Sequence, residues 1–166
     1  YRVSTDPIGC SLAESAEAPA YGAYLMDAAE TPRSLHVVYI NTSLVTKAKA
    51  HAIVPTITCT SSNVVRTVLQ AATQIPEVHI WFGPDTYMGD NLTRMFRSLA
   101  EMPDEQIRHL HPAHDQKSIR ALLPRFHYFE QGTCIVHHMF GREVVELVRE
   151  HYSDVFVTAH LEVPGE

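Results

Sequence analysis

The sequence predicts an α/β fold in which a parallel β-sheet is covered by helices on both faces. Two observations lead to this prediction. Segments with the pattern of strands alternate along the chain with segments that have the pattern of helices. The strand-like segments include short apolar runs rich in β-branched residues, which is typical of strands buried in a parallel sheet. A regular alternation of this kind indicates Rossmann-like, three-layer αβα units.

The alternation is clear in the first part of the chain. Residues 11–29 have a helical pattern that is interrupted near Pro19, and Ser34–Asn41 form a β-branched strand that stops at Asn-Thr-Ser. A helix is expected at 43–52, followed by a short buried strand at 55–59 that ends in Cys59. Each strand is thus followed by a helix, as a parallel connection requires.

The same pattern continues to the end of the sequence. Residues 61–74 carry apolar side chains at helical spacing: Val64, Val65, Val68, Leu69 and Ala72. Ser61, Ser62 and Asn63 stand at the start of this helix, where N-caps belong. The following segments predict a strand at 77–83, a loop and helix at 84–102, a strand at 125–129, an amphipathic helix at 142–152 and a final strand at 154–162.

The segment 101–125 differs from the rest because it is polar and lacks a clear strand. We expect it to be a helical insertion on the surface. Its histidines, His109, His111 and His114, are candidate metal ligands. No cysteine or carboxylate pattern typical of zinc sites surrounds them, so an exposed histidine-containing loop is the favoured interpretation.

The composition limits the classes of function. The 166 residues are 45% hydrophobic and 19% charged, enough for a packed core in one domain or one and a part. The net charge of −6 argues against a nucleic-acid partner, because binding a phosphate backbone requires clustered Lys and Arg. No apolar run reaches the length that spans a membrane. We expect the chain to be part of a longer protein.

Polar residues gather where the predicted strands end. Parallel α/β sheets bind ligands at the carboxyl ends of their strands. The segments expected at this edge are Tyr39–Ser43, Cys59–Asn63, Pro84–Gly89 and His160–Glu162. Asp85 is interpreted as a structural turn residue, with Gly89 allowing the chain to bend.

The sequence has three cysteines, an odd number that does not suggest a disulfide framework. Cys10 and Cys134 each closely follow a glycine and precede an apolar helical start. If they mark matching points of related α/β units, they converge on a shared axis, where thiolates suit an iron–sulfur cluster. The alternative, that they are ordinary free cysteines, stays open.

Several motifs together resemble the quinolinate synthase family. They are "IGCSLAES", "VVYINTSLVTKA", "TCTSSNVV", "WFGPDTYMGDN", "GTCIVHHMFGREVVELVREHY" and "AHLEVPGE", in the family's order and over nearly the whole chain. The segment 101–125, with "PTITCTSSN" and "TCIVHH", resembles the plastid form of plants and green algae. The resemblance implies condensation of iminoaspartate with dihydroxyacetone phosphate to quinolinate, phosphate and water, in the de novo route to NAD.

The resemblance also implies an architecture and a cofactor. Family members have three α/β domains around a pseudo-threefold axis, with a [4Fe–4S] cluster on the axis acting as a Lewis acid. Residues 1–10 would end one domain, 11–134 form the second with 101–125 inserted, and 135–166 begin the third. It further implies a location in the chloroplast stroma, or otherwise the cytoplasm. L-aspartate oxidase would supply iminoaspartate, a homodimer is an allowed assembly, and a desulfurase-activating domain upstream is a feature of the plastid form.

The matching motifs imply roles for individual residues. Cys10 and Cys134 match two cluster ligands, the third lying outside this chain, while Cys59 matches none. The residues matching catalytic positions are Tyr39, His137 and Glu162. Those matching substrate-binding positions are Asn41, Ser61 and His160. The family's usual His-Pro-Glu reads His-Leu-Glu here, which keeps both functional side chains.

Two other classes of function remain as alternatives. The first is a zinc-dependent hydrolase or zinc-binding module that uses Cys10, Cys134 and histidines. The second is a non-catalytic α/β fragment whose thiols are structural.

Overall fold

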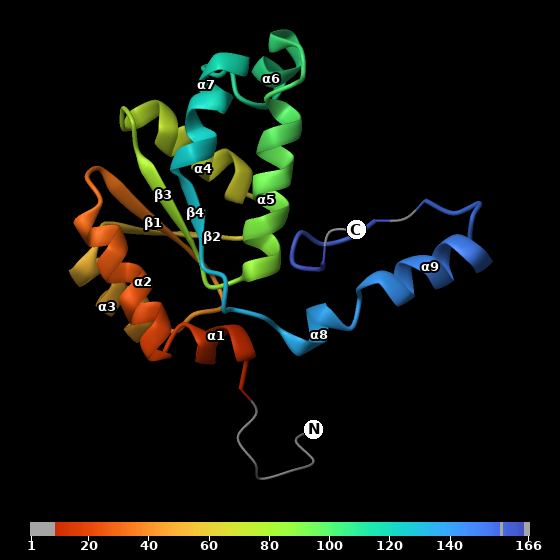
Figure 1. The fold of residues 1–166 in the computed structure, drawn as a ribbon, viewed down its shortest axis with the longest axis horizontal. Helices are drawn as coiled ribbons and strands as arrows, with labels where there is room; N and C mark the ends of the chain where they lie inside the picture. The colour runs from red at the N-terminus through yellow and green to blue at the C-terminus, as the bar shows by residue number, and fades with distance from the viewer. Residues whose placement is uncertain (1–8, 157, 165–166) are drawn as a thin grey trace.

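The structure is a computed structural model that describes residues 9–156 and 158–164. Its centre is a parallel four-stranded sheet in the order β2-β1-β3-β4 (Figure 1). The strands are β1 (Ser34–Tyr39), β2 (Thr56–Cys59), β3 (His79–Gly83) and β4 (Phe126–Tyr128). Tyr39 pairs with Cys59 and Val38 with Gly83, so three strands end at nearly the same level. The predicted α/β class and these four strands are confirmed.

Helices cover both faces of the sheet, as predicted. One face carries α2 (Pro19–Glu30) and α3 (Leu44–Ile53), and the other carries α4 (Val64–Gln74) and α5 (Thr86–Leu99) (Figure 1). The chain passes from β1 to β2 on one side and then returns across β1 to reach β3. The strand order therefore reverses between β1 and β3, and doubly wound sheets bind ligands outside the strand ends at such a reversal.

The sheet separates two hydrophobic cores. The larger core packs the sheet residues Val37, Ile80 and Phe82 against α4 and α5, including Val64, Val68, Leu69, Leu92 and Phe96. The smaller core on the other face contains Tyr21, Leu25, Ala28, Ala50, Val54 and Phe129. The helical spacing of the apolar residues in α4 thus corresponds to its buried face, and hydrophobic burial fixes both helix layers on the sheet.

A buried polar network crosses the smaller core. The Tyr21 hydroxyl lies 2.7 Å from Nε2 of His36, and Nδ1 of His36 lies 3.1 Å from Oγ1 of Thr56. His36 is fully buried, and burial lowers its pKa to about 3. The imidazole is therefore neutral at physiological pH, with both ring nitrogens hydrogen-bonded.

Strand β2 differs from the prediction because it is not buried along its length. It is an edge strand, and Ile57 remains 38% exposed, whereas Cys59 at its end is 1% exposed. An edge strand has a neighbour on only one side, so its apolar residues need less cover than those of β1.

The segment 101–125 is helical as expected, but it is not a surface addition. It forms α6 (Asp104–Leu110), α7 (Gln116–Leu122) and the 3₁₀ turn η1 (Leu123–Arg125). Ile107, Ile119 and Leu122 belong to the larger core. The sequence did not reveal this role, because only a few apolar residues in an otherwise polar segment pack against the core.

The histidines of this segment form structural hydrogen bonds. His111 Nε2 lies 3.1 Å from Oε1 of Gln70, and His114 Nε2 lies 2.8 Å from the carbonyl oxygen of Leu69. His109 is exposed. His111 and His114 therefore attach the segment to α4, so the expectation of an exposed loop is wrong for the buried His114.

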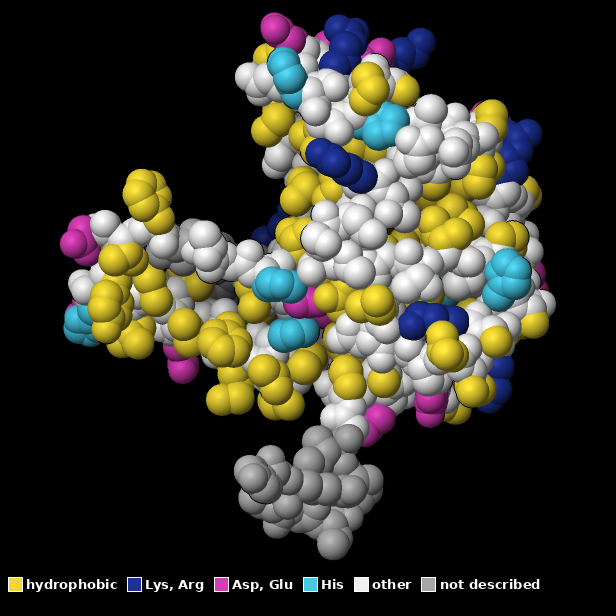
Figure 2. Space-filling view, turned by 180° about the vertical axis from the view of Figure 1, so that it is seen from behind, with side chains coloured by type: hydrophobic (Ala, Val, Ile, Leu, Met, Phe, Trp, Pro, Cys, Tyr) yellow, Lys and Arg dark blue, Asp and Glu magenta, His cyan; other side chains and the backbone are white. Residues whose placement is uncertain are grey.

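The C-terminal part of the chain begins with α8 (Ile135–His138) and α9 (Arg142–His151), which project away from the sheet (Figure 1). Helix α9 is amphipathic as predicted, but none of its residues is buried against the described part of the chain. Figure 2 shows hydrophobic side chains along this arm, and Ile135, Met139 and Phe140 are among the exposed ones. Such a patch is typical of a surface that another structural element covers.

The predicted final strand is wrong for the described residues 154–156 and 158–162, which form turns and irregular backbone. A strand requires a neighbouring strand for its backbone hydrogen bonds, and the four-stranded sheet offers none at this place. Instead, the Asn91 side chain of α5 donates hydrogen bonds to the carbonyls of Leu161 and Val163, at 2.8 and 2.7 Å. Among the described helices, none is long and apolar enough to cross a membrane.

Candidate active site

Four chain segments meet at the carboxyl edge of the sheet, beside the reversal between β1 and β3. Tyr39 ends β1, Ser61 follows β2, Asp85 follows β3, and Glu162 comes from the segment held by Asn91. The predicted clustering of the strand ends is therefore confirmed for these residues.

Tyr39 contacts two other predicted site residues. Burial raises the pKa of Tyr39 to about 12, and a hydrogen bond from its hydroxyl to Glu162 adds to this effect. A hydrogen bond from Ser61 opposes it, because it stabilises the phenolate. At neutral pH the phenol is protonated, with a carboxylate and a second hydroxyl beside its oxygen. Ser61 does not cap α4, since the N-cap residue is Asn63.

Glu162 is a buried carboxylate that faces two histidines. Its side chain is 8% exposed, its Oε2 pairs with Nδ1 of His160, and the same oxygen lies 3.9 Å from Nε2 of His137. His160 is 60% exposed, so it reaches Glu162 from the solvent side. His160 and Glu162 thus form a pair, and a turn brings them together.

His137 and His138 point to different partners, as expected for adjacent residues of a helix. Nδ1 of His137 lies 3.5 Å from Oδ2 of Asp85, within the site. His138 is exposed, and its Nδ1 lies 2.5 Å from the hydroxyl of Tyr87. The structure therefore brings His137 into the cluster and leaves His138 at its margin.

Asp85 is a member of the site that the sequence interpretation missed. It is the N-cap of α5, and its Oδ1 accepts the backbone N–H of Met88 at 2.8 Å. Burial raises the pKa of Asp85 to about 6, and the Glu162 carboxylate adds to the rise, while hydrogen bonding to Met88 and the charge of His137 oppose it. The capping position agrees with a structural role, but Oδ2 faces His137 instead of the helix.

Gly89 does not form a bend, in contrast to the prediction. It lies inside α5, and no described glycine has a positive φ. A Cβ at Gly89 would lie 2.4 Å from Cβ of Tyr128. The glycine is required because α5 packs closely against β4, not because the backbone turns.

Cys10 and Cys134 occupy equivalent local positions. Cys10 is the N-cap of α1 (Ser11–Ser15) with φ −104° and ψ 121°, and Cys134 is the N-cap of α8 with φ −104° and ψ 124°. Each thiol therefore lies at the N-terminus of a short helix. Burial alone would raise the pKa of Cys134, but hydrogen bonds from the Ser11 side chain and from the backbone of His137 and Val136 lower it below the ordinary value.

The glycine before Cys134 has a structural reason. A Cβ on Gly132 would lie 1.6 Å from the carbonyl oxygen of Pro84, so only glycine permits this approach. Gly132 donates its N–H to Oγ1 of Thr86 at 2.9 Å, and its carbonyl accepts the N–H of Thr86 at 2.8 Å. These contacts attach the segment that carries Cys134 to the start of α5.

The remaining predicted residues are placed as follows. Asn41 is exposed, and its Nδ2 lies 3.9 Å from Sγ of Cys10, so it accompanies the cysteine and not Tyr39. Cys59 belongs to the larger core, and burial raises its pKa to about 12. Within residues 9–156 and 158–164, no group of three or more His, Cys, Asp and Glu could hold a metal ion.

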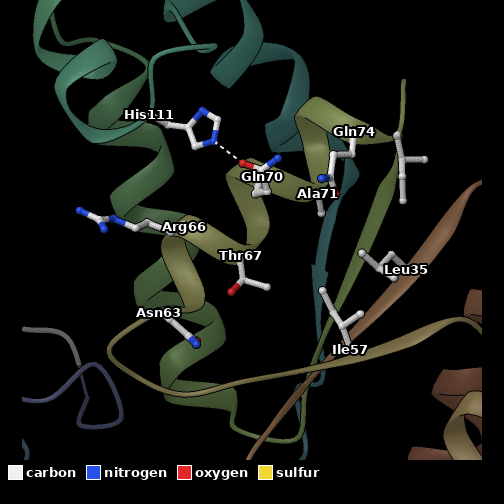
Figure 3. Close-up of a pocket in the computed structure, with 10 residues that line it drawn as sticks. Leu35, Ile57, Asn63, Arg66, Thr67, Gln70, Ala71, Gln74 and His111 are labelled. Carbon is white, nitrogen blue, oxygen red and sulfur yellow. Dashed lines mark hydrogen bonds between the residues drawn. The ribbon is translucent and has the colours of Figure 1, made fainter.

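A separate cavity of about 510 Å³ lies between α4 and the β2 edge (Figure 3). Its floor is formed by apolar side chains, including Leu35 and Ile57, and its rim includes Arg66, Gln70 and His111. None of the residues in the cluster around Tyr39 lines this cavity, so the presence of a cavity alone does not identify the site. The site is identified instead by the polar groups that converge at the strand ends.

Fold and site together define a doubly wound parallel α/β protein with a polar, cysteine-bearing site at the carboxyl edge of its sheet. Comparison with known proteins gives a more specific result. The model of the family described as "Quinolinate synthetase A protein" matches residues 3–166. The chain belongs to this family.

Similar proteins include the chloroplastic quinolinate synthases of Arabidopsis thaliana and Oryza sativa subsp. japonica, which are 61% and 60% identical to the whole chain. The quinolinate synthase of Saccharolobus solfataricus is 30% identical over 99% of the chain. The chain spans 23% of the length of the two plant relatives and 42% of the archaeal one. No solved structure gives a significant match.

Proposed function

We propose that this chain is part of a plastid quinolinate synthase, which condenses iminoaspartate with dihydroxyacetone phosphate in NAD biosynthesis. The proposal is supported by membership of the family and by the chloroplastic relatives. The observation that carries it is the convergence of Tyr39, Ser61, His137 and Glu162 beside the sheet edge where Cys134 begins α8.

Cys10 and Cys134 fit two ligands of a [4Fe–4S] cluster. Both are N-caps with the same backbone conformation, and hydrogen bonds lower the pKa of Cys134, so it favours the thiolate that iron requires. A cluster with one iron open to substrate would supply Lewis-acid activation of a substrate oxygen. The third thiolate would come from the rest of the protein.

Tyr39 and Glu162 are suited to move protons. The phenol of Tyr39 is protonated at neutral pH and donates to the carboxylate of Glu162. It can therefore deliver a proton to a substrate oxygen while Glu162 accepts one from carbon, as the condensation and dehydration steps require. His160 pairs with Glu162 and stabilises its negative charge when the imidazole is protonated.

Substrate binding falls to the polar groups around this pair. The Ser61 hydroxyl stands next to Tyr39, in the turn before α4, where backbone N–H groups favour a carboxylate or phosphate. Asn41 lies beside Cys10 and offers an amide to a substrate group bound there. Burial of Glu162 and Asp85 limits water at the reacting centre.

The test uses the complete protein, prepared without oxygen. Iron and sulfide are measured, and quinolinate formation is assayed with iminoaspartate and dihydroxyacetone phosphate. We expect four irons and four sulfides per chain and formation of quinolinate. One zinc and no iron would favour the hydrolase alternative, and a colourless protein without metal would favour the non-catalytic one.

Location, assembly and partners belong to the same proposal. The names of the plant relatives support a plastid location, for which we propose the stroma. L-aspartate oxidase is the proposed supplier of iminoaspartate, and a homodimer is the proposed assembly. The net charge of −6 continues to argue against nucleic acid as a partner.

A further inference from the structure

The imidazole of His137 lies between two buried carboxylates. Its Nδ1 is 3.5 Å from Oδ2 of Asp85, and its Nε2 is 3.9 Å from Oε2 of Glu162. The two carboxylate side chains are 1% and 8% exposed. A neutral histidine carries one ring proton. The hydrogen bond made by one ring nitrogen decides which nitrogen holds this proton and whether the other can accept one.

The two carboxylates differ in their other partners. Glu162 already has His160 at Oε2 and the hydroxyl of Tyr39. Asp85 uses Oδ1 for the N–H of Met88, but its buried Oδ2 has no hydrogen-bond partner, and neither has Nδ1 of His137. These two buried atoms face each other. When Asp85 is ionised, a small approach satisfies both atoms with the proton on Nδ1.

We propose that Asp85 is the positioning residue of His137, which it holds with the proton on Nδ1 so that Nε2, on the side of Glu162, is left free to accept a proton. This inference rests on the proposed function, because it gives His137 a place in that reaction. Asp85 does not touch the reacting atoms and acts through the imidazole alone.

The local fold makes Asp85 suitable for this task. Its carboxylate cannot rotate freely, because Oδ1 is fixed by the first turn of α5. The segment leading to His137 is attached to the same turn through Gly132 and Thr86. A second group fixed on a rigid element is what keeps a functional side chain in one orientation.

The variant Asp85→Asn distinguishes two roles of Asp85, which are positioning the His137 imidazole and capping α5. Asparagine caps helices about as well as aspartate, so a residue that only caps α5 tolerates the change. Its amide nitrogen, however, replaces Oδ2 with a donor and forces the proton of His137 to Nε2. The matched control is Asp115→Asn, because Asp115 caps α7 with the same 2.8 Å bond to the third backbone N–H and forms no ion pair with a histidine in the described part of the chain.

The first measurement does not depend on activity. Imidazole ¹⁵N shifts are recorded on the complete protein in its iron-free form, and His137 is assigned by the signal lost in His137→Gln. We expect protonated Nδ1 in the unchanged protein and in Asp115→Asn, and protonated Nε2 in Asp85→Asn. Protonated Nε2 in the unchanged protein overturns the proposal.

The second measurement is the kinetics of the iron-loaded complete protein. We expect Asp85→Asn to lower kcat on the order of 10²-fold, with KM nearly unchanged and no loss of iron. In a His137→Gln background, Asp85→Asn should cost nothing further. A normal kcat in Asp85→Asn, or additive losses in the double variant, overturns the positioning role. If the unchanged protein makes no quinolinate, the proposed function fails, while the ¹⁵N shifts still decide the role of Asp85.

Discussion

Cys10 and Cys134 are N-cap residues of two different helices and differ by only 3° in ψ, 121° against 124°. They are far apart in the sequence, yet each holds its thiol at a helix start. Ser11, which follows the first cysteine, hydrogen-bonds the thiol of the second. The two helix starts are therefore neighbours at one end of the molecule.

This relationship predicts different results for the three cysteines in the complete protein. Cys10→Ser and Cys134→Ser should each abolish most of the iron and all activity, because serine is a poor replacement for a thiolate ligand. Cys59→Ala should keep iron and most activity, at a stability cost of about 1 kcal/mol, since Cys59 is an apolar core residue. Iron analysis and thermal unfolding measure both effects. Loss of iron in Cys59→Ala with full iron in Cys10→Ser would contradict the assignment.

Tyr39→Phe removes the hydroxyl that joins Ser61 to Glu162. We expect unchanged iron content and a kcat that is lower by about 10²-fold or more, the usual scale for the loss of a proton-transfer group. Steady-state kinetics and iron analysis give the two numbers. Tyr152→Phe, at an exposed position, serves as the control. Turnover near that of the control would remove Tyr39 from the catalytic residues.

Gly89→Ala should destabilise the chain although alanine is the better helix former. Alanine gains up to about 1 kcal/mol in a helix, but a Cβ 2.4 Å from Tyr128 forces α5 away from β4, which costs about 1–3 kcal/mol. In the helical control Gly22→Ala, nothing lies within 4 Å of the added Cβ, so we expect a gain of about 0.5–1 kcal/mol. Urea unfolding gives the change in the free energy of unfolding for each variant. A gain in stability for both variants would argue against tight packing at Gly89.

His36 predicts how stability changes with pH. Its pKa falls from 6.5 to about 3 on folding, so the unfolded state binds a proton that the folded state does not. The stabilisation is therefore complete above pH 6.5 and is lost as the pH falls towards about 3, by up to about 1.4 kcal/mol per pH unit. The free energy of unfolding is measured with urea at several pH values between about 4 and 7. It should change less steeply with pH in His36→Gln than in the control His109→Gln. Identical slopes would contradict a neutral buried His36.

The sequence by itself determined the α/β class, the four strands of the sheet and the helices between them. Periodicity is a local property, and the burial of β1 or α4 can be read from the spacing of a few apolar residues. It also placed Tyr39 and Ser61 correctly, because the carboxyl ends of parallel strands must share an edge. The pairing of Glu162 with His160 was likewise predictable, since only Leu161 separates them in the chain.

Only the tertiary structure decided which distant side chains meet. It showed that Asp85 faces His137, that Asn91 folds the segment of Glu162 back onto α5, and that Gly89 is small because of Tyr128. It also replaced the final predicted strand with turns and buried the middle of segment 101–125. These features depend on contacts between residues far apart in the sequence. Propensity and periodicity carry no information about such contacts, because packing and hydrogen bonding are satisfied only in three dimensions.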